Sequence, residues 1–174
     1  MSVLGEFRRV SPAVLEEIRA DPEKAWDRVD RLPDGVDLDR AWERLARLMD
    51  KAGFPLNPIS GGALFPDEAH AFGRDGDSRA LTPAQVAEVA ARLSRTPFTD
   101  LEPHLRPLLD AEGWFQLPEP PLLEPFTPTE ADFHPVDDET AKAIRNTLAE
   151  AYDELVEFFT LAAQNNQCTV FWAA

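Results

Sequence analysis

The clearest pattern in the chain is a stripe of apolar residues between positions 137 and 165. Its members recur at spacings of three and four, the period of one helix face: Ala141, Ile144, Leu148, Ala151, Leu155 and Ala162. Asp137, Asp138 and Glu139 fall in the first turn, where the helix dipole favours negative charge. The pattern predicts one long helix over 137–165, long enough at about 1.5 Å per residue to span a small domain.

Shorter helices are marked by a capping side chain followed by proline. The pairs are Ser11–Pro12, Asp21–Pro22, Thr82–Pro83 and Thr127–Pro128. A side-chain oxygen at the N-cap satisfies a free backbone N–H, and proline suits the first helical position. With the apolar spacing, these signals predict helices at about 11–20, 22–31, 38–52, 83–95 and 100–112.

Both ends of the chain read as strands. Residues 3–10 and 168–172 are short and rich in β-branched and aromatic side chains. Pairing them in one sheet would satisfy their backbone groups and hold both ends in place. The sequence therefore predicts an α+β fold, in which a small mixed sheet that includes both chain termini packs against several helices, one of them long and C-terminal.

Two segments lack periodicity, at 53–80 and 113–136, and both contain many glycines or prolines. The whole chain has 174 residues, the size of one domain. We predict a single domain over 1–174 with a proline-rich arm at about 113–136. Apolar residues in this arm predict that it packs on the body.

Charge narrows the range of partners. The chain has 17 Lys and Arg against 32 Asp and Glu, a net charge of −15, which argues against a nucleic-acid partner. No stretch of membrane-spanning length is free of charge, and no signal peptide is recognised. We therefore expect a cytoplasmic location and no membrane partner.

Negative charge concentrates in the C-terminal half. Glu150, Asp153, Glu154 and Glu157 lie on the predicted exposed face of the long helix. A stripe of this kind is either a solvated surface or a face that attracts a basic protein partner.

Residues that carry chemistry are few. His70, His104 and His134 lie in separate segments with no metal-ligand spacing. The single cysteine, Cys168, is predicted to be a buried, inert thiol. With no nucleotide-binding or nucleophile motif, we expect no catalytic residue, no metal and no cofactor.

The segment from Asp37 onward is the most informative. Leu38, Trp42, Leu45 and Met49 form one apolar stripe, so Trp42 is predicted to be a core residue. The alternative is a ligand pocket. Its residues would be Asp39, Trp42, Gly61, Gly62 and Arg79.

The order of these signals resembles a known family. A first strand precedes Ser11–Pro12, and then come Asp37-Leu-Asp-Arg-Ala-Trp, Gly61–Gly62, Arg79-Ala-Leu-Thr-Pro, a long helix and a final strand. This order resembles the YfbM-like family of uncharacterised bacterial proteins. The resemblance implies an α+β fold and brings no established reaction, cofactor or site residue.

Three functions remain open. The leading hypothesis is a non-enzymatic acidic binding domain that engages a basic protein partner, as an adaptor or toxin-neutralising protein would. The alternatives are a small ligand-binding protein or hydrolase using the pocket around Trp42, and a homo-oligomeric structural protein. The sequence leaves the oligomeric state undetermined.

Overall fold

The larger β-sheet contains strands from both ends of the chain. The structure is a computed structural model that describes residues 4–112, 114–115 and 133–174. The strand order is β2-β1-β7-β4-β3, with β1 Gly5–Val10, β2 Gly35–Asp37, β3 Ala63–Leu64, β4 Arg79–Leu81 and β7 Cys168–Ala173. The predicted pairing of the two terminal strands is confirmed, because β1 and β7 pair from Gly5 with Ala173 to Val10 with Cys168. The sequence predicts a mixed sheet, but every strand pairing in this sheet is antiparallel.

Three of these strands were not predicted. β2, β3 and β4 contain only two or three residues each, too few for alternation to show in the sequence. β3 and the start of β4 lie in the segment 53–80 that was expected to be irregular. A separate pair, β5 (Trp114–Phe115) and β6 (Phe133–His134), lies in the proline-rich arm, and residues 113 and 116–132 of the arm lie outside the described part.

The predicted helices are present. They are α1 Pro12–Arg19, α2 Ala25–Asp30, α3 Ala41–Lys51, α4 Pro83–Arg95, α5 Glu102–Glu112 and α6 Asp138–Gln164, with the 3₁₀ turns η1 Pro22–Lys24 and η2 Phe98–Asp100. Thr82 and Gln85 form a complete capping box at the start of α4. Asp21 makes no side-chain cap, and there the chain forms the turn η1 before α2. None of the described helices is long and apolar enough to cross a membrane.

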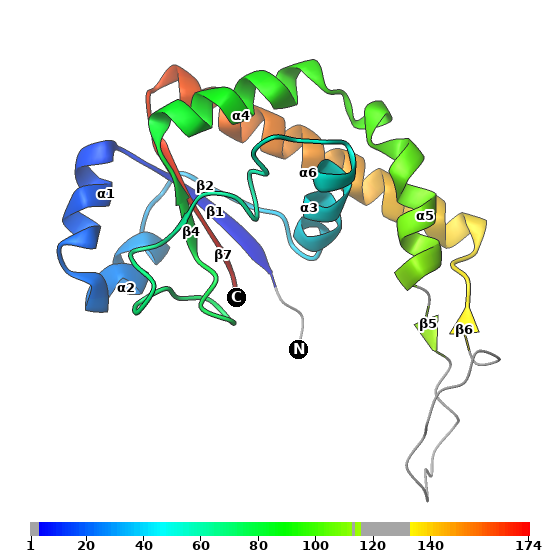
Figure 1. Cartoon of the computed structure of the whole chain (residues 1–174), viewed down its shortest axis with the longest axis horizontal. Coiled ribbons are helices and arrows are strands. Elements are labelled where there is room, and N and C mark those ends of the chain that lie inside the picture. The colour runs from blue at the N-terminus through cyan, green and yellow to red at the C-terminus, as the bar shows by residue number, and fades with distance from the viewer. Residues whose placement is uncertain (1–3, 113, 116–132) are drawn as a thin grey trace, which may run out of the picture.

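Helices cover both faces of the larger sheet, with α1 and α2 on one side and α3, α4 and α6 on the other (Figure 1). Trp172 and Val170 of β7 point to the side of α1 and α2, where they join a buried cluster with Ile18 and Val29. Phe171, between them, points to the opposite side and joins the cluster formed by α3, α4 and α6. This alternation explains why all six residues of β7 are buried.

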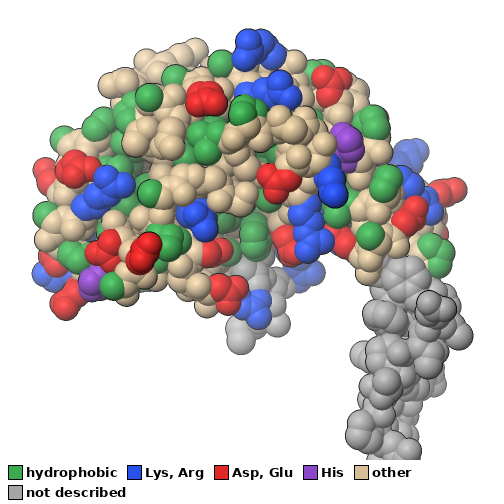
Figure 2. Space-filling view, viewed as in Figure 1, with side chains coloured by type: hydrophobic (Ala, Val, Ile, Leu, Met, Phe, Trp, Pro, Cys, Tyr) green, Lys and Arg blue, Asp and Glu red, His purple; other side chains and the backbone are tan. Residues whose placement is uncertain are grey.

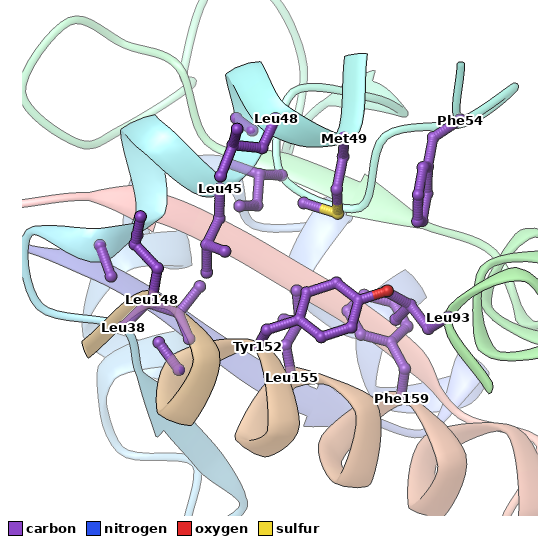
Figure 3. Close-up of a cluster of buried hydrophobic side chains, with 14 of the residues drawn as sticks. Leu38, Leu45, Leu48, Met49, Phe54, Leu93, Leu148, Tyr152, Leu155 and Phe159 are labelled. Atoms are coloured by element: carbon purple, nitrogen blue, oxygen red, sulfur yellow. The ribbon is translucent and has the colours of Figure 1, made fainter. Parts of the chain in front are cut away.

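The long helix α6 forms the centre of the larger cluster. Figure 3 shows Leu148, Tyr152 and Leu155 of α6 pointing toward the apolar side chains of α3. The hydroxyl of Tyr152 donates a hydrogen bond of 2.6 Å to the backbone oxygen of Thr96, which satisfies this buried polar group. The apolar stripe read from the sequence is therefore the buried face of the helix.

Candidate functional site

An open cleft of about 640 Å³ lies at one end of the larger sheet. Its walls come from the start of α3, the turn at 73–75, the end of α5 and the last residue of β7. The lining residues are Arg40, Trp42, Glu43, Arg44, Arg47, Arg74, Asp75, Glu112 and Ala173. Figure 2 shows basic side chains gathered with acidic ones on the part of the surface over α3.

Trp42 forms the apolar part of this cleft. Its ring centroid lies 5.7 Å from that of Phe171, and its Cβ lies against Gly5 of β1. A Cβ built on Gly5 would come within 2.5 Å of the Trp42 Cβ, so a glycine there lets α3 approach the strand. Trp42 is partly buried, and its side chain packs against the larger apolar cluster as its stripe predicts. It lies in the first turn of α3, at the open end of the sheet, so the rest of the side chain faces the cleft.

Two of the cleft's arginines are held by carboxylates. Arg44 Nε lies 2.8 Å and Arg47 Nη1 3.3 Å from the oxygens of Glu112, at the end of α5. Arg47 Nη2 also lies 2.9 Å from Glu43. These ion pairs connect α3 to α5 and fix the direction of both guanidinium groups.

Arg74 differs from them, because within the described residues no carboxylate lies in ion-pair distance of its exposed side chain. The lining residues include four arginines and three carboxylates, so they carry one positive charge in excess. The chain as a whole carries −15. The cleft is therefore a locally basic site on an acidic protein, and it favours small anions.

A partly buried carboxylate lies next to the cleft. Asp77 Oδ1 is buried without a hydrogen-bond partner in the described structure, and it lies 2.8 Å from where a Cβ on Gly73 would be. Burial raises the pKa of Asp77, and the backbone N–H of Ala173 offsets part of this rise. Gly73 has φ +90°, which keeps the turn close to Ala173 and leaves no room for a side chain.

Only one of the five residues of the predicted pocket lines this cleft. Trp42 lines the cleft, while Gly62 and Arg79 lie at the β3–β4 end, where the Arg79 guanidinium donates to Gly62 O at 3.1 Å. Gly61 closes a turn by donating to Asn57 O at 2.9 Å. Asp39 is in a turn with φ +46°, where its N–H donates to Asp37 Oδ1 at 2.7 Å.

The sequence contained part of the signal for the cleft. Arg40, Arg44 and Arg47 recur at four and three along α3, which places them on one side of that helix. Arg74 and Glu112 come from distant segments, so their place in the cleft could be found only from the fold.

The other candidate residues do not line the cleft. Cys168 is buried as predicted, and burial raises the pKa of its thiol, which disfavours the reactive thiolate. His70 is exposed, with Nδ1 2.8 Å from Asp67. Over the described ranges, no group of three His, Cys, Asp or Glu residues could hold a metal ion. Glu150, Asp153, Glu154 and Glu157 are all exposed on α6, and their role in binding a partner stays a prediction.

The fold and this cleft define an α+β domain with a small basic cleft, and comparison with known proteins places the chain in a family. The family model Domain of unknown function (DUF1877) matches residues 1–112, so the chain belongs to this family. The structure of YfbM from Escherichia coli, titled as a protein of unknown function, is similar with a TM-score of 0.62. That likeness covers 98% of this chain and 99% of YfbM at 10% sequence identity, and so it concerns the fold alone. No curated protein matches the sequence.

Proposed function

We propose that this domain binds a small organic anion with a flat apolar part in the cleft beside Trp42. The observation that carries the proposal is that Trp42 and four arginines line one open cavity of about 640 Å³ on a chain of net charge −15. Ligand sites commonly have volumes of roughly 300–1,000 Å³. This function is the ligand-binding alternative of the sequence analysis, with a different set of residues around Trp42.

The two parts of the cleft suit two parts of such a ligand. The half-buried indole offers a flat face for stacking, while guanidinium groups bind carboxylates and phosphates with paired donors. Arg44 and Arg47 are already oriented by Glu112, which lowers the entropy lost on binding. Arg74 has no carboxylate within ion-pair distance in the described structure, so its charge is available to a ligand.

The net charge also limits the ligand's size. A long polyanion on the cleft would extend over acidic surface and be repelled, whereas a compact anion would meet the local arginines alone. The proposal therefore concerns compounds the size of a nucleotide or smaller.

Isothermal titration calorimetry with three probes tests this proposal. Adenosine monophosphate has both a ring and an anionic group, adenosine has only the ring, and inorganic phosphate has only the charge. We expect adenosine monophosphate to bind more tightly than either of the others. Binding of adenosine alone, or of none of the three, would contradict the proposal.

Two variants locate the binding. Arg74→Ala should weaken binding by about 1 kcal/mol, roughly fivefold in Kd. The matched control is Arg31→Ala, which removes the same charge from another exposed position that does not line the cleft. Equal losses in the two variants would show a general charge effect and not a site.

A further inference from the structure

We infer that edge strand β2 and the neighbouring face of α6 form a docking surface for an extended basic segment of a partner protein. The surface has three parts, which are an open strand edge, an apolar groove and a stripe of carboxylates. No described residue lines both this groove and the Trp42 cleft, so the inference is independent of the proposed ligand.

The open edge is the outer side of β2. β2 stands at the end of the strand order and pairs with β1 on its inner side only. Arg9 N donates to Asp34 O and Leu38 N donates to Gly5 O, both at 2.8 Å. In an antiparallel ladder with this pattern, the backbone groups of Val36 face β1, and those of Gly35 and Asp37 face outward.

Gly35 and Asp37 are both exposed, and among the described residues nothing pairs with their outward backbone donors and acceptors. A further strand that adds to such an edge gains main-chain hydrogen bonds, which is a common mode of peptide recognition. The short length of β2 limits the strand to a few residues, which favours a peptide segment over a broad interface.

The apolar groove lies beside this edge. It has a volume of about 220 Å³ and is lined by three apolar side chains together with a glycine, two carboxylates and one arginine: Val36, Phe158, Leu161, Gly35, Glu154, Glu157 and Arg9. Leu161 is 37% exposed, and in the described part of the chain only Trp26 is another large apolar side chain so open to solvent. The groove has room for one apolar side chain of a partner.

The carboxylates supply the charge that selects the partner. Glu150, Asp153, Glu154 and Glu157 follow one another along the exposed side of α6 and lead to Leu161. Across the described residues none of the four forms an ion pair. The arginine that lines the groove, Arg9, lies over the Phe158 ring, and its guanidinium is 3.6 Å from Asp34.

A segment with lysine or arginine would meet opposite charge here. A second copy of this chain would bring the same acidic stripe to the same edge, and repulsion would oppose the pairing. The occupant is therefore a basic segment of another protein, which gives the sequence-based expectation of a basic partner a defined place.

The strand geometry fixes the partner's pattern. A residue opposite Val36 points to the same side of the sheet as Val36, toward the groove, and residues two positions away on either side also point toward α6. The preferred segment is an apolar residue with lysine or arginine two positions before and two positions after it.

A labelled peptide in which lysine alternates with threonine around one central leucine tests the inference. Binding is followed by fluorescence anisotropy, and amide hydrogen exchange shows where the peptide lies. We expect slower exchange at the N–H groups of Gly35 and Asp37. The double variant Glu154→Gln/Glu157→Gln should weaken binding by about twofold to thirtyfold.

Two controls separate strand addition from simple attraction of charges. The variant Glu23→Gln/Glu88→Gln removes two exposed carboxylates elsewhere and should leave binding within about twofold of the parent. A peptide with the same side chains and a backbone methylated at the pairing nitrogens should bind at least about tenfold more weakly, because it cannot complete the ladder.

Three results would overturn the inference. One is that the methylated peptide binds as tightly as the unmethylated peptide. Another is that Glu23→Gln/Glu88→Gln weakens binding as much as Glu154→Gln/Glu157→Gln does. The third is a dimer, seen by sedimentation, that protects Gly35 and Asp37 without peptide, since a second copy would then be the occupant. Adenosine monophosphate binding in the Trp42 cleft has no bearing on any of these results.

Discussion

At the scale of single residues, Asp77 links stability to pH. Burial raises its pKa above the ordinary value of 3.8, so the folded protein holds this proton more firmly than the unfolded chain does. Protonated Asp77 therefore favours the folded state. Its contribution to the free energy of unfolding is fully present below the ordinary pKa of 3.8 and is lost as pH rises through the pKa of the folded state. At neutral pH the folded state therefore carries the cost of a partly buried carboxylate.

Replacing this residue with asparagine should remove that cost and keep an oxygen that can accept a hydrogen bond. We expect the free energy of unfolding of Asp77→Asn, relative to the parent, to rise from about pH 3 to about pH 7. Urea denaturation at both pH values measures the difference. A relative stability that falls over this range would show that the charge is favourable in the fold.

At the scale of elements, the capping box at α4 is the clearest local signal that the structure confirms. Gln85 N–H donates to Thr82 Oγ1 at 3.4 Å, and Thr82 N–H donates to Gln85 Oε1 at 2.9 Å.

Thr82→Ala should lower the free energy of unfolding by about 1 kcal/mol, because it removes this cap. Ser94→Ala, an exposed change near the other end of the same helix, serves as the control and should stay within about 0.5 kcal/mol. Thermal denaturation followed by circular dichroism compares the two, and equal losses would remove the cap as the cause.

Elements were predictable where the signal was local and long. The stripe from Ala141 to Ala162 fixed α6 to within a residue at each end, because many positions repeat the same period. β2, β3 and β4 were missed since two or three residues carry no period, and their strand character comes from neighbours distant in sequence, as when Val36 pairs with Phe7. The spacing of Trp42 identifies the inward stripe of α3 but gives no information on where the sheet ends, so it does not reveal the cleft beside this side chain.

At the scale of the whole molecule, β7 holds the sheet together. It lies between β1 and β4, all six of its residues are buried, and Phe171 contacts Phe7 at 4.8 Å between ring centroids.

Removing residues 168–174 should abolish cooperative unfolding. Phe171→Ala, a graded form of the same test, should cost about 3–5 kcal/mol. Differential scanning calorimetry measures both, and a truncated chain that melts like the parent would refute a central role for β7.

The cleft shows why a binding site is harder to predict than a fold. Arg40, Arg44 and Arg47 lie close in sequence, but they form a wall of the cleft only because Glu112 from α5 and Arg74 from a loop meet them. This arrangement depends on how α3 and α5 pack together, and the spacing of residues within either helix does not predict that packing.

The pairing of β1 with β7 also constrains the order of events during synthesis. Strand β1 has its main partner in β7, which is synthesised long after it, so the central ladder cannot close until β7 has left the ribosome. Until then α3 and α4 lack the apolar face of α6 that covers them. The stretch 1–112 matched by the family model contains neither α6 nor β7, and as a nascent chain it exposes surface that a chaperone would recognise.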